Sequence, residues 1–216
     1  VAADYNYVWF KNYQEIAHID GYKEMMIATV TFALGTTILT IVISFITALA
    51  LDKRGKGHLP RGLMRSLWFL PALLSGTVVG MLWRIMYNYN NGVINKMLVS
   101  AGMEPVNWLE TRGITNIAVI IGSTWVQIGF CVIVFLAGLQ SIPQDLYESS
   151  RIDGANNFQQ YTKITLPYMM FVLGPYLLTS SLKNLHNFNV IYLLSGGGPT
   201  ITKINGVIAD SNYIYG

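Results

Sequence analysis

The chain has 216 residues, of which 52% are hydrophobic and only 12% are charged. A soluble domain carries about 25% charged residues, so the composition excludes a disordered chain and argues against an ordinary cytosolic enzyme. The net charge of +3 is too small for a protein that binds the nucleic-acid backbone. The single cysteine and three scattered histidines exclude an internal disulfide and give no metal-binding pattern.

Long charge-free runs predict an all-α membrane protein, because about 20 helical residues cross the hydrocarbon core of a bilayer. We expect four spans, and the fourth is the most polar, with Lys183 following its apolar part. The spans lie at about residues 25–51, 66–84, 115–142 and 166–190.

Two of these spans contain a proline, Pro71 in the second and Pro175 in the fourth. Each removes a backbone hydrogen bond, which predicts kinks that face protein or a water-filled path. Gly76 and Gly80, four residues apart in the second span, indicate either close helix packing or room for a ligand.

The distribution of lysine and arginine predicts the orientation in the membrane. Residues 52–65, between the first two spans, contain five basic residues and one acid, so this loop should be cytoplasmic. The loop 143–166 then also lies in the cytoplasm, and the extracytoplasmic segments are 1–24, 85–113 and 194–216. With no initial methionine, we expect a fragment of a chain of six or more spans.

The most informative segment is the polar loop between the third and fourth spans. Pro143 suits a first helical turn, Gly154 breaks that helix, and Asn156 can cap a second short helix over residues 157–164. A helix–glycine–helix elbow of this kind is either an ordinary connector or a docking shape on the membrane surface.

The same loop resembles the EAA loop of ABC importer permeases. That family has Glu-Ala-Ala, three residues, Gly, nine residues and Ile-x-Leu-Pro, and every spacing is kept here, with two serines replacing the alanines. The matching positions are Glu148, Ser149, Ser150, Gly154, Ile164, Leu166 and Pro167. The surrounding DLYESSRIDGANNFQQYTKITLP and the later YLLSGGGPT are similar to the carbohydrate-uptake branch, in particular to its maltose-type larger permease family.

This resemblance implies a polytopic helical bundle of the type I importer kind that is not itself an enzyme. Two cytoplasmic ABC ATPases would bind ATP and Mg²⁺, and this chain would hold no cofactor or metal. A second, different permease and an extracytoplasmic sugar-binding protein complete the complex in the cytoplasmic membrane of a prokaryote. The ATPases would dock on the residues around the loop glycine, which are Glu148, Ser149, Ser150, Asp153, Gly154 and Ala155.

Three predicted helices carry polar or aromatic stripes at helical spacing that could line one path for sugar. In the fourth span Ser180, Asn184 and Asn187 share a face, and in the third Ser123, Gln127 and Phe130 do. In the second span Gly76, Gly80 and Trp83 have the same spacing. The resemblance places the fourth-span trio on family sugar contacts with identities kept, whereas the third-span residues differ. Polar residues that only join helices are the alternative. Trp83 and Trp125 could stack on a sugar ring or anchor the span ends.

The sequence therefore predicts a permease subunit that moves a sugar or oligosaccharide. Since the sequence predicts no buried charge in any span, a neutral hydroxylated solute is favoured. The alternatives are an importer of another polar solute and, from another class, a channel or a non-transporting membrane scaffold, neither of which has a use for an EAA loop.

Overall fold

The computed structural model describes residues 9–18, 22–52, 61–111, 113–196, 201–204 and 207–210. Nearly all of these residues are helical, as the sequence predicted. The elements are α1 (Lys11–Ala17), α2 (Tyr22–Leu51), α3 (Arg61–Phe69), the 3₁₀ turn η1 (Leu70–Leu73), α4 (Gly76–Met86), α5 (Val93–Ser100), α6 (Ile114–Ser141), α7 (Gln144–Ile152), α8 (Asn157–Gln160), the π-helical turn η2 (Tyr161–Thr165), α9 (Leu166–Leu185), α10 (Phe188–Ser195), β1 (Ile201–Ile204) and β2 (Val207–Asp210).

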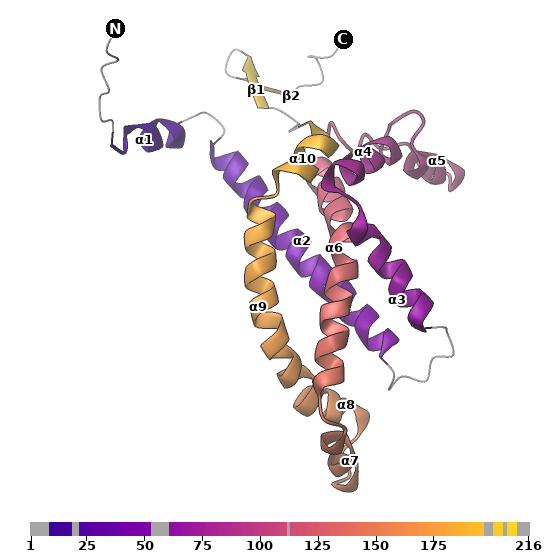
Figure 1. Cartoon of the computed structure of the whole chain (residues 1–216). Coiled ribbons are helices and arrows are strands. Elements are labelled where there is room, and N and C mark those ends of the chain that lie inside the picture. Colours follow the sequence, from indigo (N-terminus) through magenta and orange to yellow (C-terminus); the bar gives the residue numbers. More distant parts are fainter. Residues whose placement is uncertain are drawn as a thin grey trace.

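The bundle is built on α2 and α6, which pack along each other, with α9 against both (Figure 1). Neither long helix has an interior proline or charge after Glu24. α6 ends where Ile142 turns to an extended conformation in front of Pro143, since the residue before a proline avoids the helical region. Phe135 of α6 is fully buried and its ring meets Phe45 of α2 and Tyr176 of α9, both at 5.8 Å between ring centroids.

The second predicted span is broken rather than merely kinked. The segments Arg65–Leu73 and Gly76–Met86 are bent by 101°. Ser75 starts the second segment by accepting a hydrogen bond from the Val78 amide, as an N-cap serine does. The sequence predicted a kink at Pro71 within one continuous helix. In the structure, the helix breaks just after this residue.

Glycine at two positions allows helices to approach closely. A Cβ added to Gly80 would lie 2.7 Å from the Cβ of Leu193 in α10, and one added to Gly129 would meet the backbone of Trp68. For Gly80, the packing interpretation therefore holds, since the space beside it is filled by α10.

Among the described residues, α2 and α6 are long and apolar enough to cross a membrane, and the bent pair makes a third if it forms one span. The fourth predicted span, α9, falls outside this group. Its C-terminal half contains Thr179, Ser180, Ser181, Lys183 and Asn184, which lower its hydropathy. The polar side chains in this half of α9 therefore have to be explained by their contacts with neighbouring helices.

Beyond the spans, α10 packs on α4, and β1 pairs with β2 in a short antiparallel ladder from Ile201–Asp210 to Ile204–Val207. These two strands add to a fold that the sequence predicted as all-α. Residues 53–60 of the basic loop 52–65 and large parts of the terminal segments 1–24 and 194–216 lie outside the described residues. The predicted sides of the membrane for these segments therefore stay predictions.

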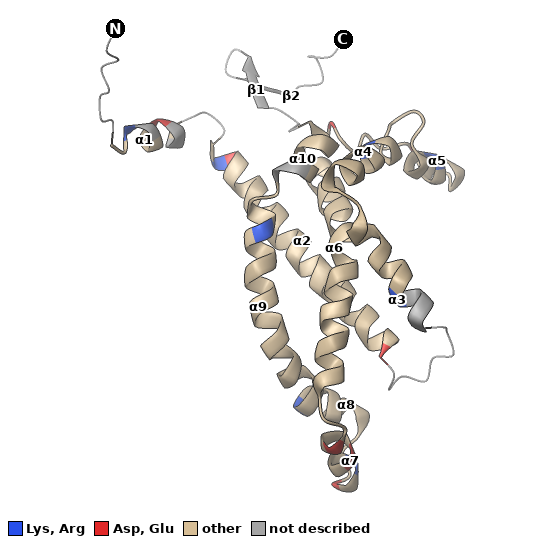
Figure 2. Cartoon of the chain, in the orientation of Figure 1, with Lys and Arg blue, Asp and Glu red and all other residues tan. Residues whose placement is uncertain are grey.

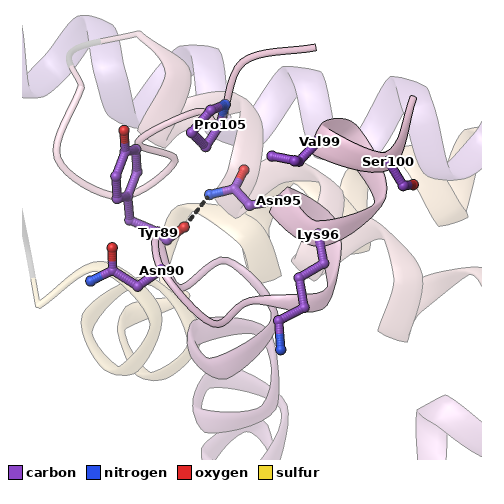
Figure 3. A pocket seen from close by; sticks show the side chains of 7 residues that line it. All are labelled: Tyr89, Asn90, Asn95, Lys96, Val99, Ser100 and Pro105. Atoms are coloured by element: carbon purple, nitrogen blue, oxygen red, sulfur yellow. Dashed lines mark hydrogen bonds between the residues drawn. The ribbon is translucent and has the colours of Figure 1, made fainter. Parts of the chain in front are cut away.

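The connection from α4 to α6 is held together by one buried amide, Asn95 of α5, which is 2% exposed. Its Nδ2 donates to the carbonyls of Tyr89 and Val106, and its Oδ1 accepts from the Val106 amide and from Trp108 Nε1, at 2.9 to 3.1 Å. Figure 3 shows the bond to Tyr89. All four hydrogen-bonding capacities of the amide are used, so Asn95 fixes this segment.

Replacing Asn95 with alanine should therefore lower the free energy of unfolding by about 2–3 kcal/mol, because buried donors and acceptors lose their partners. Thermal unfolding of the purified chain in detergent measures this. Asn90→Ala is the matched control, since Asn90 is exposed and lines the same small pocket as Asn95 (Figure 3). Equal unfolding temperatures for the two variants would contradict the assignment.

Candidate functional site

A groove of about 410 Å³ opens between the α3–η1 segment, α6 and α9. This volume is in the range of ligand pockets in proteins. Three of the six residues predicted to bind substrate line it, namely Gln127, Phe130 and Ser180. The full lining combines aromatic faces with hydrogen-bonding groups and consists of Phe69, Ala72, Val126, Gln127, Phe130, Tyr176, Thr179, Ser180 and Lys183.

Behind the groove, a chain of hydrogen bonds connects the three central helices. Gln127 Nε2 donates to Asn184 Oδ1 at 2.9 Å, and Asn184 Nδ2 donates to Thr37 Oγ1 at 3.0 Å. Asn184 is 1% exposed and does not line the groove. In this conformation its amide therefore positions Gln127, which does line the groove, rather than facing the open space.

Thr37 was not among the predicted site residues. It is one of four buried hydroxyl residues on α2 at positions 36, 37, 40 and 44, a pattern visible in the sequence as polar residues inside an otherwise apolar span. Ser44 Oγ donates to the Ile128 carbonyl at 3.2 Å. These hydroxyl residues of α2 are the feature of the sequence from which a hydrogen-bond partner for the Asn184 amide could have been predicted.

The other predicted substrate residues lie elsewhere. Ser123 is buried in α6 and Asn187 is half-buried just after α9, and neither lines the groove. The backbone amide of Asn187 donates to the Asn184 carbonyl at the helix end. The predicted stripes therefore do not all meet at one surface, because α9 ends at Leu185 before the third member of its trio.

The two tryptophans that could have stacked on a sugar instead pack on each other. The Trp83 and Trp125 rings lie 5.9 Å apart in an edge-on arrangement, and Trp83 is also 5.2 Å from Tyr87. Trp83 is buried in the cluster around Val79 and Leu194. Their observed contacts are therefore those of core residues.

Lys183 corrects one sequence expectation. The sequence analysis ended the apolar part of the fourth span at Lys183 and expected no buried charge in any span. In the structure, α9 continues beyond it to Leu185, and its side chain lines the groove beside Gln127 and Ser180. Figure 2 shows the charged residues mostly at the ends of the helices, and the basic position of α9 lies near the upper end of that helix.

The second candidate site is the elbow, residues 143–165, which extends beyond the bundle below α6 and α9 (Figure 1). Gly154 adopts a φ of +80°, a conformation that favours glycine. The amide of Ala155 donates to the Ser150 carbonyl and that of Gly154 to the Arg151 carbonyl. This is the Schellman arrangement that ends α7, so the glycine is required by the turn itself.

The second arm of the elbow begins as predicted and continues further than predicted. Asn156 and Gln159 form a reciprocal capping box at the start of α8. The sequence expected this helix to stop at residue 164 before a new span. Instead α8 passes through η2 directly into α9, since no residue in the segment interrupts the helical backbone.

Side chains that the sequence did not single out join the two arms. Gln160, which is 6% exposed, donates to Ser150 Oγ at 2.9 Å, and the Tyr147 and Thr165 hydroxyls lie 2.8 Å apart. Ser150 stands at one of the two positions where the EAA pattern has alanine, and its hydroxyl accepts a hydrogen bond that an alanine could not accept. The arms are fixed to each other, so the elbow is a rigid unit at the base of α9.

The predicted docking residues occupy the turn and the outward face of α7. Glu148, Asp153 and Gly154 are exposed, Ala155 is half-buried, and the Ser149 hydroxyl donates to the Asp145 carbonyl of its own helix at 2.8 Å. The exposed apolar side chains of Ile152 and Phe158 flank them. An acidic rim around apolar side chains is a surface that a protein partner can cover.

Comparison with known proteins places this geometry in a family. The model of the family described as "Binding-protein-dependent transport system inner membrane component" matches residues 25–215. Over 193 residues the chain is 36% identical to the trehalose/maltose transport system permease protein MalF of Thermococcus litoralis, covering 89% of this chain and 64% of that protein. It is 28% identical to the galactooligosaccharides transport system permease protein GanP of Bacillus subtilis, covering 91% and 48%.

A solved structure shows the same fold. The crystal structure of a bacterial alginate ABC transporter in complex with an alginate pentasaccharide-bound periplasmic protein contains a chain that matches with a TM-score of 0.73 at 23% identity, covering 88% of this chain and 69% of that one. The predicted resemblance and the predicted helical permease fold are thereby confirmed. The chain spans less than two thirds of the MalF and GanP relatives. It belongs to the family of inner membrane components of binding-protein-dependent transport systems.

Proposed function

We propose that the chain is the membrane-spanning permease subunit of an ATP-driven importer of sugar or oligosaccharide. The observation that carries this proposal is the elbow, a rigid turn with an exposed apolar and acidic surface continuous with α9. A partner that closes on this surface would move α9 as a lever, which is a hinge-type transition. A channel or scaffold has no use for such a lever.

The groove supports a hydroxylated substrate. Gln127, Thr179 and Ser180 offer hydrogen-bonding groups, and Phe69, Phe130 and Tyr176 offer aromatic faces. Pockets for small ligands combine apolar walls with a few polar groups that fix orientation. Polar side chains are costly inside a membrane bundle unless they are paired or face a wet cavity. Here Gln127 is paired with Asn184 and Thr179 with the Pro175 carbonyl, and both residues line the groove.

The complete machine would contain further chains. Two cytoplasmic ABC ATPases would dock on the elbows and carry ATP and Mg²⁺, a second permease would close the other side of the groove, and an extracytoplasmic binding protein would deliver the sugar. The family description and the relatives named as sugar permeases support this assembly in the cytoplasmic membrane.

The test is copurification. The chain is tagged in its native host, extracted in a mild detergent, and its partners are identified by mass spectrometry. We expect an ABC ATPase and a second permease. Recovery of the chain alone, under conditions that keep a reference ABC complex together, would contradict the proposal and favour a channel or scaffold.

The turn glycine offers a test of coupling. A β-branched residue strongly disfavours positive φ, so Gly154→Val should distort the elbow and lower ATP-dependent uptake about tenfold or more, at a backbone cost of ~1–3 kcal/mol. Gly102→Val is the matched control, since Gly102 also has a φ of +80° and open space around it but lies in the segment after α5. Equal losses of uptake in both variants would indicate general instability instead of a coupling role.

The hydrogen bond between Thr37 and Asn184 offers a test of the groove. Thr37→Val keeps the shape of the side chain and removes the bond, so Asn184 and then Gln127 lose their fixed positions. The sugar concentration for half-maximal uptake should rise about fivefold to tenfold, as expected for one buried hydrogen bond. Thr47→Val is the control, because the Thr47 hydroxyl bonds only within α2, to the Ile43 carbonyl at 2.8 Å. An unchanged concentration dependence in Thr37→Val would remove α2 from the site.

A further inference from the structure

The feature that the proposed function leaves unexplained is a positive charge in the groove. Lys183 lines the groove together with Gln127 and Ser180 and is the single charged residue of α9. The predicted neutral path has no need of it. The role of an ammonium group among aromatic and amide side chains therefore has to be found in the substrate or in a partner.

The level of Lys183 in the bundle excludes the simplest explanation, which is an anchor at the membrane surface. Its neighbour Asn184 bonds to Thr37, near the midpoint of α2, and to Gln127, near the midpoint of α6. At 1.5 Å per residue these positions are roughly 20 Å of helix from either end. Lys183 therefore lies near the middle of the bundle along its length, with its side chain exposed at the groove.

The chain itself supplies no counter-charge at this level. The helices that form the groove contain no aspartate or glutamate: the sequence has none between Asp52 and Glu104, between Glu110 and Asp145, or between Asp153 and Asp210. Among the described residues, the structure has one ion pair, in which Lys11 Nζ lies 3.9 Å from Glu15 Oε1 in α1. Lys183 is therefore not paired with any acid in the described part of this chain. A lysine inside a membrane bundle is costly without a partner or water, so its charge points to a ligand.

We propose, on the basis of the proposed importer function, that the groove takes an acidic oligosaccharide and that Lys183 binds the carboxylate of one of its uronate units. A single lysine matches a group of charge −1. A charge-assisted hydrogen bond in a site of low dielectric is stronger than a neutral one, so this ammonium–carboxylate contact would dominate recognition of the uronate unit. Gln127 and the aromatic faces of Phe69 and Phe130 are left for the sugar rings.

The experiment compares matched substrates in the intact transporter, reconstituted with its ATPases, second permease and binding protein. Oligogalacturonates of two to five units are tested for ATP-dependent uptake beside the same oligosaccharides with their carboxyl groups reduced to alcohols. A panel of neutral oligosaccharides is included as well. Each is measured for the natural chain, for Lys183→Met and for Lys183→Arg. Lys96→Met is the control, because it removes the same charge from α5, outside the groove.

The natural transporter should take up the acidic form in preference to the reduced form. Lys183→Met should lower the ratio of acidic to reduced uptake at least about tenfold, while Lys183→Arg and Lys96→Met keep it. Because every variant uses the same binding protein, a change in the ratio reports on the groove.

Three results would overturn the proposal. Uptake of neutral sugars with no uptake of any uronate would leave the importer function in place and exclude the acidic substrate. Equal loss of both forms in Lys183→Met would indicate that Lys183 pairs with a carboxylate of a partner subunit. Absence of uptake for every sugar in the panel would instead count against the proposed function itself.

Discussion

The structure depends on the pairing of polar groups inside an apolar bundle. Asn184 is buried between α6 and α2, and its amide is satisfied on one side by Gln127 and on the other by Thr37. Leaving such a group unpaired in an apolar surrounding costs several kcal/mol in order of magnitude. The three helices are therefore held at the one arrangement in which all partners meet, and the groove lies directly beside this point.

In the elbow, polar groups are likewise paired by hydrogen bonds, here at the surface of the molecule. Its turn uses backbone bonds around Gly154, its second arm starts with a capping box, and Gln160 and Tyr147 join the arms through side chains. Because α8 and η2 run without interruption into α9, the two polar assemblies belong to one continuous helical segment. A displacement of the elbow therefore reaches the level of the groove through one continuous helix, which contains Pro175, with no loop in between.

The sequence predicted the local features well because they follow from local chemistry. The length of α6, the glycine turn and the Asn156 cap are all set by residues within a few positions of each other. It did not predict the 101° break after Leu73, the pairing of Asn184 with Thr37, or the place of Lys183 in the groove. Each of these depends on residues distant in sequence. Thr37 and Asn184 are 147 positions apart, and no periodicity within α2 or α9 could show that they meet.

The π-helical turn η2 at the base of α9 bears on how related permeases can change during evolution. A π turn holds one residue more than the α-helical turn that it replaces, so it advances the phase of all that follows by roughly 100°. The face that α9 directs toward α6 is thus fixed by a one-residue surplus near Tyr161–Thr165. Losing that residue would leave the glycine turn at Gly154 and the Asn156 capping box in place and turn a different set of side chains inward. Relatives could therefore exchange their inner lining through a single deletion, without altering the residues of the lining itself.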